Sequence, residues 1–425
     1  MKPIWIYLLA IAGFLAAGIM FCLPIEGEFD GAAVVIPSVI IICLTVITVI
    51  ARKKPFLFKV MFAGLIAKLF AGWLYTALPS FQGTDARWVY FETARQLSTS
   101  ATDIAYFFPL HRLWGTNFII FIASYLFLLI GPSLAAAMVL FGMVSFWGEF
   151  LLYCAFVRAF PAADRRLAAL AIFLFPSVVY WTAMLGKDAL MLFAIGLIAY
   201  GVARRFDANG WFAIVLGSAL ASMIRPHIGA FLAISLFATY IISDLRQRRQ
   251  VIGLKLLLFP IFIIVCLGMA TYARESLDLN SLDDAQAMAE FAHEHDNVGG
   301  SAFGGETTPV DRFAGAPLLM FRPFPWEANK ASVLVASCEG LALFIFVFRR
   351  RTGLLRLLRN ARSTPLVVFA GCFFTIFSMV FSLSLSNFGL LVRQRVMVLP
   401  LVLMLLVAAG PSVTRQGIRG RLRYA

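Results

Sequence analysis

The stretch AAVVIPSVIIICLTVITVI-ARKK-PFLFKVMFAGLIAKLFAGWLYTAL, residues 32–78, holds two long apolar runs on either side of a short basic turn. A helix needs about 20 apolar residues to cross the hydrocarbon core of a bilayer, and each run approaches that length. Backbone polar groups in lipid must be satisfied by a helix or a closed barrel, and runs this long exclude strands. The stretch therefore predicts two membrane-crossing helices, with the turn at residues 52–54 in the cytoplasm.

Apolar runs of this kind recur along the whole chain, which has 425 residues and is 61% hydrophobic. Their ranges are 4–23, 32–50, 56–78, 133–157, 166–183, 189–203, 211–224, 228–243, 254–271, 331–348, 364–384 and 389–408. They predict an all-α integral membrane protein in which residues 1–425 form one polytopic domain with about twelve transmembrane helices. The run 4–23 is longer than the ~7–15 apolar residues of a signal peptide, so we expect a retained first helix.

Charged residues fall into two sets between the runs. Arginine and lysine gather at positions 52–54, 165–166, 204–205, 246–249, 349–362 and 415–423, whereas most acids and all four histidines lie in other connections. Because basic loops stay in the cytoplasm, we expect both termini there and polar chemistry on the outer side. The net charge of +14 then reflects this bias and attraction to anionic lipids, and no nucleic-acid partner is needed. Compact loops without long polar tails are typical of a bacterial inner-membrane protein.

Two connections on the predicted outer side are long. The first extracytoplasmic loop covers residues 79–132 and the second covers residues 272–330. If the apolar stretch 117–130 crossed the membrane, the basic cluster at 158–166 would lie outside, against the charge bias. We therefore expect 117–130 to lie along or dip into the outer interface and to end at Gly131-Pro132, so that 79–132 is a loop with interfacial helices.

Arg393 and Arg395 are the sharpest functional signal, because they lie near the outer end of the last run, where the charge bias gives no reason for arginine. Charged side chains inside a bilayer are costly and face a partner or a polar cavity. Guanidinium groups suit bidentate binding to phosphate. The alternative is contact with lipid head groups, although arginines spaced i, i+2 cannot both reach them along one helix face.

Two acids stand at the start of predicted helices on the outer side. Asp85 follows the third run, and it is either the general base for an acceptor hydroxyl or, like Thr84, a cap for the next helix. Lys187 and Asp188 lie between two runs. Either Asp188 caps the following helix in an ordinary turn, or Lys187 binds phosphate while Asp188 binds the sugar or the acceptor.

Further charged residues occur at predicted outer helix ends. Arg225 and His227 belong to an Arg-Pro-His motif, and Arg322 and Glu327 delimit the segment Arg-Pro-Phe-Pro-Trp-Glu. The repeated Arg-Pro pairs are either helix punctuation or, together with Lys187, part of a group of cations for one anionic ligand near the outer leaflet. Four sites with cations on the same side of the membrane favour binding of an anionic ligand over simple helix punctuation.

Other chemistry is not indicated by the sequence. Lys68 and Glu149 lie near the middle of their runs, where a buried pair is favoured over a proton pathway. The cysteines have no metal-type spacing and His293 and His295 lack a third ligand, so no metal site is predicted. No phosphate-binding loop, dinucleotide motif or nucleophile elbow is present. An enzyme acting outside the cell would therefore need a lipid-borne activated donor.

Three features together resemble the C-type superfamily of membrane glycosyltransferases. An acid in the first large external loop corresponds to Asp85, an interfacial segment ending in glycine corresponds to 117–131, and a helix with a late proline, Pro176, leads to the external acid Asp188. The resemblance covers roughly residues 79–205. It implies inverting transfer of a sugar from a polyprenyl-phosphate donor to a glycan, lipid or protein acceptor.

The resemblance also implies roles for individual residues. Asp85 would deprotonate the acceptor hydroxyl, while Lys187, Arg393 and Arg395 would hold the departing polyprenyl phosphate by electrostatic attraction. The lipid bilayer would be a partner, because the polyprenyl tail would enter sideways between helices. The residues identify no cofactor, and use of a divalent cation stays open.

Two other functions compete with this one. A polysaccharide repeat-unit polymerase or ligase, of the O-antigen type, would depend chiefly on the arginines of the last run and would tolerate loss of the Asp85 carboxylate. A transporter or flippase would show inverted repeats and paired broken helices, and the sequence contains no such repeat.

Overall fold

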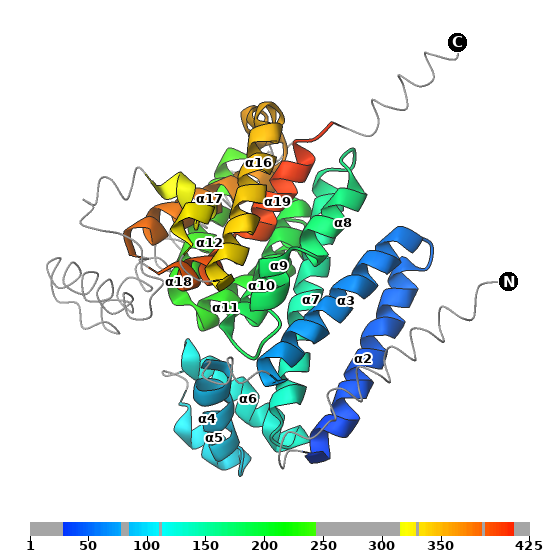
Figure 1. Ribbon diagram of the computed structural model, residues 1–425, viewed down its shortest axis with the longest axis vertical. Coiled ribbons are helices and arrows are strands. Elements are labelled where there is room, and N and C mark those ends of the chain that lie inside the picture. Colours follow the sequence, from blue (N-terminus) through cyan, green and yellow to red (C-terminus); the bar gives the residue numbers. More distant parts are fainter. Residues whose placement is uncertain are drawn as a thin grey trace, which may run out of the picture. The chain divides into compact units, whose positions relative to one another are not determined.

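Figure 1 shows the computed structural model of the chain, which describes residues 29–77, 85–109, 113–243, 315–328, 331–384 and 387–411. Every regular element in these ranges is a helix, and the ranges contain no β-strand. The predicted all-α class is therefore confirmed for the described part of the chain. The runs 4–23 and 254–271, His111, His293, His295, the basic tail and most of the loop 272–330 lie outside the described residues.

Four described helical segments are long and apolar enough to cross a bilayer. They are Val34–Ala51 within α2 (Phe29–Ala51), α3 (Pro55–Ala77), α7 (Leu134–Ala159) and Pro365–Ser382 within α17 (Pro365–Ser384). A fifth span results if α18 (Phe388–Arg395) and α19 (Leu399–Ala408), which are bent by 58°, cross together. Length and composition thus support a membrane protein, while the total of about twelve crossings stays a prediction.

The chain divides into two compact units. Unit 1 holds the described residues up to Leu151, together with 173–196 and 223–225. Unit 2 holds 152–172, 197–222 and the described residues from Pro226 onward. Residues of α7, α8 (Arg165–Phe173), α10 (Lys187–Ala203) and α11 (Ala208–Ile224) belong to both units.

In unit 1, α2 and α3 lie side by side and are joined by the basic turn at 52–54 (Figure 1). The first loop folds into the π-helix η2 (Ala86–Phe91), α4 (Glu92–Leu97) and α5 (Ala101–Phe107), which pack against α6 (Thr116–Ile130). Helix α6 ends at Gly131 as predicted, and this residue has φ +82°, a conformation that glycine adopts without strain.

In unit 2, α12 (Pro226–Ile242) packs against α17, and α16 (Ala331–Arg359) packs against α19. The short 3-10 helices of this unit are η4 (Ala316–Met320), η5 (Pro325–Glu327) and η6 (Ala361–Ser363).

In the turn between α10 and α11, Arg204 Nε donates a 2.8 Å hydrogen bond to Asp207 Oδ1. This bond holds the pKa of the Asp207 carboxyl below its usual range.

Three predicted runs differ from the helices that form on them. The run 166–183 divides into α8 and α9 (Pro176–Trp181), because the residue before Pro176 is restricted to the extended backbone seen at Phe175. The run 389–408 likewise divides into α18 and α19. The run 331–348 continues as helix α16 to Arg359, well beyond its apolar part.

Candidate functional site

The candidate site in unit 1 is centred on the N-terminus of α10. Asp188 lies in the first turn of this helix and Arg225 follows the last residue of α11. Arg225 Nη2 lies 2.7 Å from Asp188 Oδ1, and the exposed fractions of the two side chains are 7% and 2%. The carboxylate is therefore both near the positive end of a helix dipole and paired with a buried guanidinium.

Lys187 places a second cation beside this pair. A β-carbon built on Gly115 would lie 3.8 Å from the Lys187 Nζ. Gly115 has φ +63°, and its N–H donates a 2.8 Å hydrogen bond to the Met223 carbonyl near the end of α11. The turn that precedes α6 is thus bonded to the end of α11 and borders the lysine. The Asp188–Arg225 pair and the Lys187 ammonium thus both lie where the first loop contacts the ends of two helices.

The π-helix η2, which begins after Asp85, lies close to the residue that precedes Lys187. Tyr90 in η2 is buried, and a β-carbon on Gly186 would lie 3.5 Å from its ring. Asp85 is the N-cap residue of η2 and is exposed, and its side chain makes no capping hydrogen bond. The capping interpretation of the Asp85 side chain is therefore wrong, and its role as general base stays a prediction. Thr84 lies outside the described residues.

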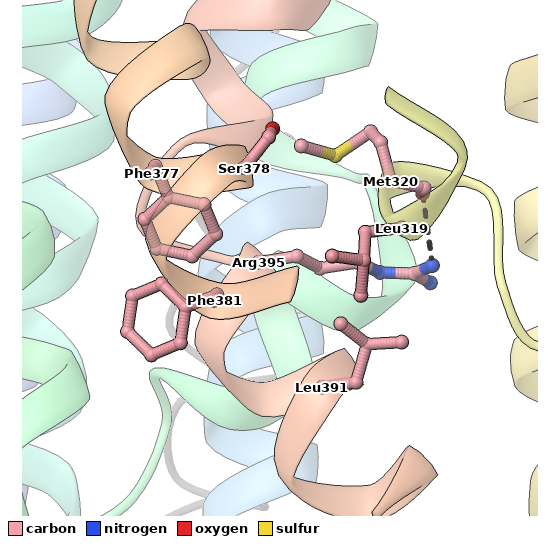
Figure 2. Close-up of a pocket in the computed structure, with 7 residues that line it drawn as sticks. All are labelled: Leu319, Met320, Phe377, Ser378, Phe381, Leu391 and Arg395. Atoms are coloured by element: carbon pink, nitrogen blue, oxygen red, sulfur yellow. Dashed lines mark hydrogen bonds between the residues drawn. The ribbon is translucent and has the colours of Figure 1, made fainter. Parts of the chain in front are cut away.

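Unit 2 contains a separate buried arginine. Arg395 Nη2 lies 3.0 Å from Glu339 Oε1, and Nη1 donates to the carbonyls of Met320 at 3.2 Å and Arg322 at 3.0 Å. The Arg395 side chain is only 1% exposed. It borders a small pocket whose other lining residues are mostly apolar, as Figure 2 shows: Leu319, Met320, Phe377, Ser378, Phe381 and Leu391. Arg395 thereby joins α18 to α16 and to η4.

The remaining predicted residues of unit 2 have local contacts. Arg322 Nε donates a 2.9 Å hydrogen bond to Glu327 Oε1, and Glu327 Oε2 accepts a 2.7 Å bond from the Phe324 N–H. This pair closes the turn at η5. The exposed His227 ring lies 6.4 Å from the ring of Phe381. Arg393 is half-buried.

The structure therefore separates the predicted residues into groups. It brings Lys187, Asp188 and Arg225 together in unit 1, and it links Arg322 to Arg395 through a backbone carbonyl in unit 2. Among the described residues, no group of three or more His, Cys, Asp or Glu side chains forms a metal-binding cluster. The predicted buried pair of Lys68 and Glu149 is confirmed, with Nζ and Oε1 2.9 Å apart.

Several contact residues were not found by sequence reasoning. Gly115, Met223 and Tyr90 border the unit 1 cluster, and Glu339 is the partner of Arg395. Of these residues, Glu339 alone could have been recognised from the sequence, because an isolated acid within an apolar run is expected to have a buried partner. Gly115, Met223 and Tyr90 are residue types that are common in any membrane protein, so their positions in the sequence carry no information about the site.

Comparison of the chain with protein-family models, with curated proteins and with solved structures finds no match.

Proposed function

We propose that this protein is a membrane glycosyltransferase that moves a sugar from a polyprenyl-phosphate donor to a glycan, lipid or protein acceptor on the extracytoplasmic side. The observation that carries the proposal is the cluster of Lys187, Asp188 and Arg225 beside the first loop. A membrane helix bundle pays a large desolvation cost for buried charges, so such clusters mark a binding site more often than an exposed cluster does. Lys187 and Asp188 are also residues to which the resemblance to the C-type superfamily points, whereas Arg225 was predicted only from its position at an outer helix end.

The reaction assigns a different task to each group. Asp85 removes the proton from the acceptor hydroxyl, and the acceptor oxygen attacks the anomeric carbon as the bond to the phosphate oxygen breaks. The departing polyprenyl phosphate gains negative charge, which the Lys187 ammonium and the Arg225 guanidinium stabilise. Asp188 orients Arg225 through their 2.7 Å contact. The polyprenyl chain stays in the bilayer, which accounts for the apolar surface of an enzyme with a polar substrate.

We also propose the number of membrane crossings and the side of the membrane on which the termini and the long loops lie. The chain is one polytopic domain of about twelve crossings in the bacterial inner membrane, with both termini cytoplasmic and with external loops at 79–132 and 272–330. Exposed aromatic side chains in the first loop support an interfacial position, since such rings prefer the level of the head groups. They are Trp88 at 62%, Phe107 at 53% and Tyr106 at 91% exposure.

A transfer assay on purified protein tests the function. Wild type is incubated with a panel of polyprenyl-phosphate sugars and host lipid-glycan acceptors, beside Asp85→Asn and Lys187→Gln. We expect Asp85→Asn to lower kcat by about 10²- to 10⁴-fold, the usual range for loss of a general base. Lys187→Gln should raise the KM for the donor and lower kcat, because the lysine holds the phosphate both before and during its departure.

Two matched variants act as controls. Asp103→Asn removes another exposed carboxylate of the first loop, and Lys59→Gln removes an exposed lysine of α3. Both should keep wild-type kinetics. The absence of product from folded wild type across the donor panel would overturn the proposal, and uptake or lipid scrambling in vesicles would then indicate a transporter.

The polymerase or ligase is retained as a second candidate because Arg393 is half-buried in α18, next to the completely buried Arg395. Of the two arginines, only Arg393 has side-chain surface to offer to a lipid pyrophosphate. A product that is lost with Arg393→Ala but kept with Asp85→Asn would favour this candidate. The length distribution of the product also separates them, because a polymerase makes a ladder of chain lengths.

A further inference from the structure

A short non-helical segment precedes the candidate site. Residues 182–186 join α9 to α10, and all five are buried. Non-helical backbone at membrane depth is tolerated only where protein or a polar cavity surrounds it, because its N–H and C=O groups need partners. The segment directly precedes Lys187 and Asp188, so its position determines the position of the backbone from which these two side chains extend.

Polar side chains of two neighbouring helices bind the start of this segment. Lys68 Nζ in α3 donates a hydrogen bond to Thr182 Oγ1 and forms the 2.9 Å ion pair with Glu149 of α7. Ser145, also in α7, donates a 2.7 Å hydrogen bond from Oγ to the Thr182 carbonyl. Both the side chain and the backbone of Thr182 are thus held by groups at the centre of unit 1.

The rest of the segment is fixed by close packing. A β-carbon on Gly72 of α3 would lie 3.3 Å from the Ala183 carbonyl oxygen, and one on Gly142 of α7 would lie 3.4 Å from it. The Leu185 N–H donates to the Met138 sulfur at 3.1 Å. Because both positions are glycine, α3 and α7 can pack closely against the backbone of Ala183 from two sides. The hydrogen bonds at Thr182 then determine which residues of the segment lie between the two helices.

We infer that the ion pair of Lys68 and Glu149 is a positioning device for the candidate site. It holds Thr182, and through residues 183–186 it sets the position of Lys187 and Asp188. Apolar residues of similar volume often replace a buried ion pair without loss of stability, so stability alone does not account for these charges. The ammonium adds what an apolar pair lacks, a directional hydrogen-bond donor for the Thr182 hydroxyl. The effect on donor binding rests on the proposed function.

The test separates positioning from folding. Lys68→Met/Glu149→Leu removes the charges as a pair, which avoids leaving one buried charge alone. Thr182→Val removes the hydroxyl at constant shape, and Thr182→Ser keeps it. Hydrogen–deuterium exchange of full-length protein in detergent reports on residues 182–188, with residues 34–51 of α2 as an internal reference. Donor KM and kcat are measured on the same samples.

We expect the double variant and Thr182→Val to exchange about tenfold faster at 182–188, with the α2 reference unchanged. Donor KM should rise by about tenfold in both variants, and Thr182→Ser should behave as wild type. A purely structural role predicts fewer folded molecules, and so a lower apparent kcat at unchanged KM. That result, or unchanged exchange at 182–188 in the two variants, would overturn the inference.

The result of the hydrogen–deuterium exchange does not depend on the reaction being correctly identified. If wild type transfers no sugar, the proposed function fails, while the exchange of 182–188 still decides whether the ion pair holds the segment. If wild type is active and exchange rises without a change in donor KM, the segment is held by the pair but does not set the phosphate site. The positioning role would then be rejected.

Discussion

At the scale of single residues, three described ion pairs are buried or largely buried and join parts of the chain that are far apart in sequence. They are Lys68 with Glu149, Arg225 with Asp188, and Arg395 with Glu339. Each pair lies within one unit, and within the described part of the chain no backbone hydrogen bond connects the two helices or segments that each pair joins. Charges in a bilayer are costly unless paired, so these contacts select one arrangement of helices over others with the same apolar surface.

Arg393 and Arg395 should differ sharply when each is replaced. Arg395→Met removes the cation from Glu339 and the donors from two backbone carbonyls, which should cost about 3–5 kcal/mol of unfolding free energy. Arg393→Met removes a half-buried side chain and should cost less than about 1 kcal/mol. Unfolding by SDS titration of detergent-solubilised protein measures both values.

The assay of sugar transfer completes this comparison. If Arg393 binds phosphate, Arg393→Met lowers transfer although the fold is intact. An Arg395→Met protein as stable as wild type would contradict the structural role of the buried guanidinium.

Sequence reasoning identified the charged residues of the site but not their partners. Lys187, Asp188 and Arg225 were singled out because they stand at the outer ends of apolar runs, and the structure places them together. The pairing of Asp188 with Arg225 could not be predicted, because it depends on how two separate helices end side by side. Neither hydropathy nor local spacing contains that information.

At the scale of elements, apolar runs predict where helices lie better than where they end. Hydropathy marks the part of α16 that is apolar, yet the helix continues through its arginines and leucines, which are strong helix formers, to Arg359. The break before Pro176 was within reach of sequence reasoning, because the residue before a proline avoids helical backbone. The bend of 58° between α18 and α19 has a comparable signal, because Pro400 stands in the first turn of α19 and lacks the N–H that a continuous helix would need.

Small residues set the distance between α7 and α10 in unit 1. A β-carbon on Gly196 would lie 2.5 Å from the Gly148 carbonyl oxygen, and one on Gly148 would lie 2.7 Å from the Phe193 Cα. These distances are shorter than van der Waals contact, so backbone atoms would have to move. Close helix crossings of this type depend on glycine because lipid gives little hydrophobic drive for association.

Gly196→Ala should therefore destabilise the protein by about 1–3 kcal/mol, the usual cost of overpacking. Gly371→Ala is the matched control, because a β-carbon at Gly371 of α17 would meet no atom within 4 Å. Alanine there should be neutral or add up to about 1 kcal/mol through its better helix propensity. Thermal unfolding of both variants measures the difference, and equal melting temperatures would show that α7 and α10 do not cross at these glycines.

At the scale of the whole molecule, contacts within each unit agree with the topology deduced from charge. In unit 1, Gly115 bonds Met223, and both belong to segments predicted near the outer side. In unit 2, Arg205 donates a 2.9 Å hydrogen bond to the Ser363 carbonyl, and both belong to predicted cytoplasmic connections. These contacts join segments that the parity of twelve crossings places on one side.

The parity argument depends on α6, and labelling of single cysteines can decide it. Helix α6 has 15 residues. At ~1.5 Å per residue it is about 22 Å long, which is less than the ~30 Å of the hydrocarbon core. Helices α11 and α12, which are predicted to cross, have only 17 residues. The charge bias, more than the length, therefore leads us to expect α6 at the outer interface, with the first loop outside and the connection between α7 and α8 inside.

The experiment uses a variant whose six native cysteines are replaced, with one new cysteine at the exposed positions Ala101, Ala162 or Asn360. In intact cells, a membrane-impermeant maleimide should label the Ala101→Cys protein only. Ala162→Cys and Asn360→Cys should react after permeabilisation, because both lie at predicted cytoplasmic connections. Labelling of Ala101→Cys and Ala162→Cys together in intact cells would mean that α6 crosses the membrane. In that case every later connection changes sides, and Lys187, Asp188 and Arg225 face the cytoplasm, where a polyprenyl-phosphate donor for external transfer would not reach them.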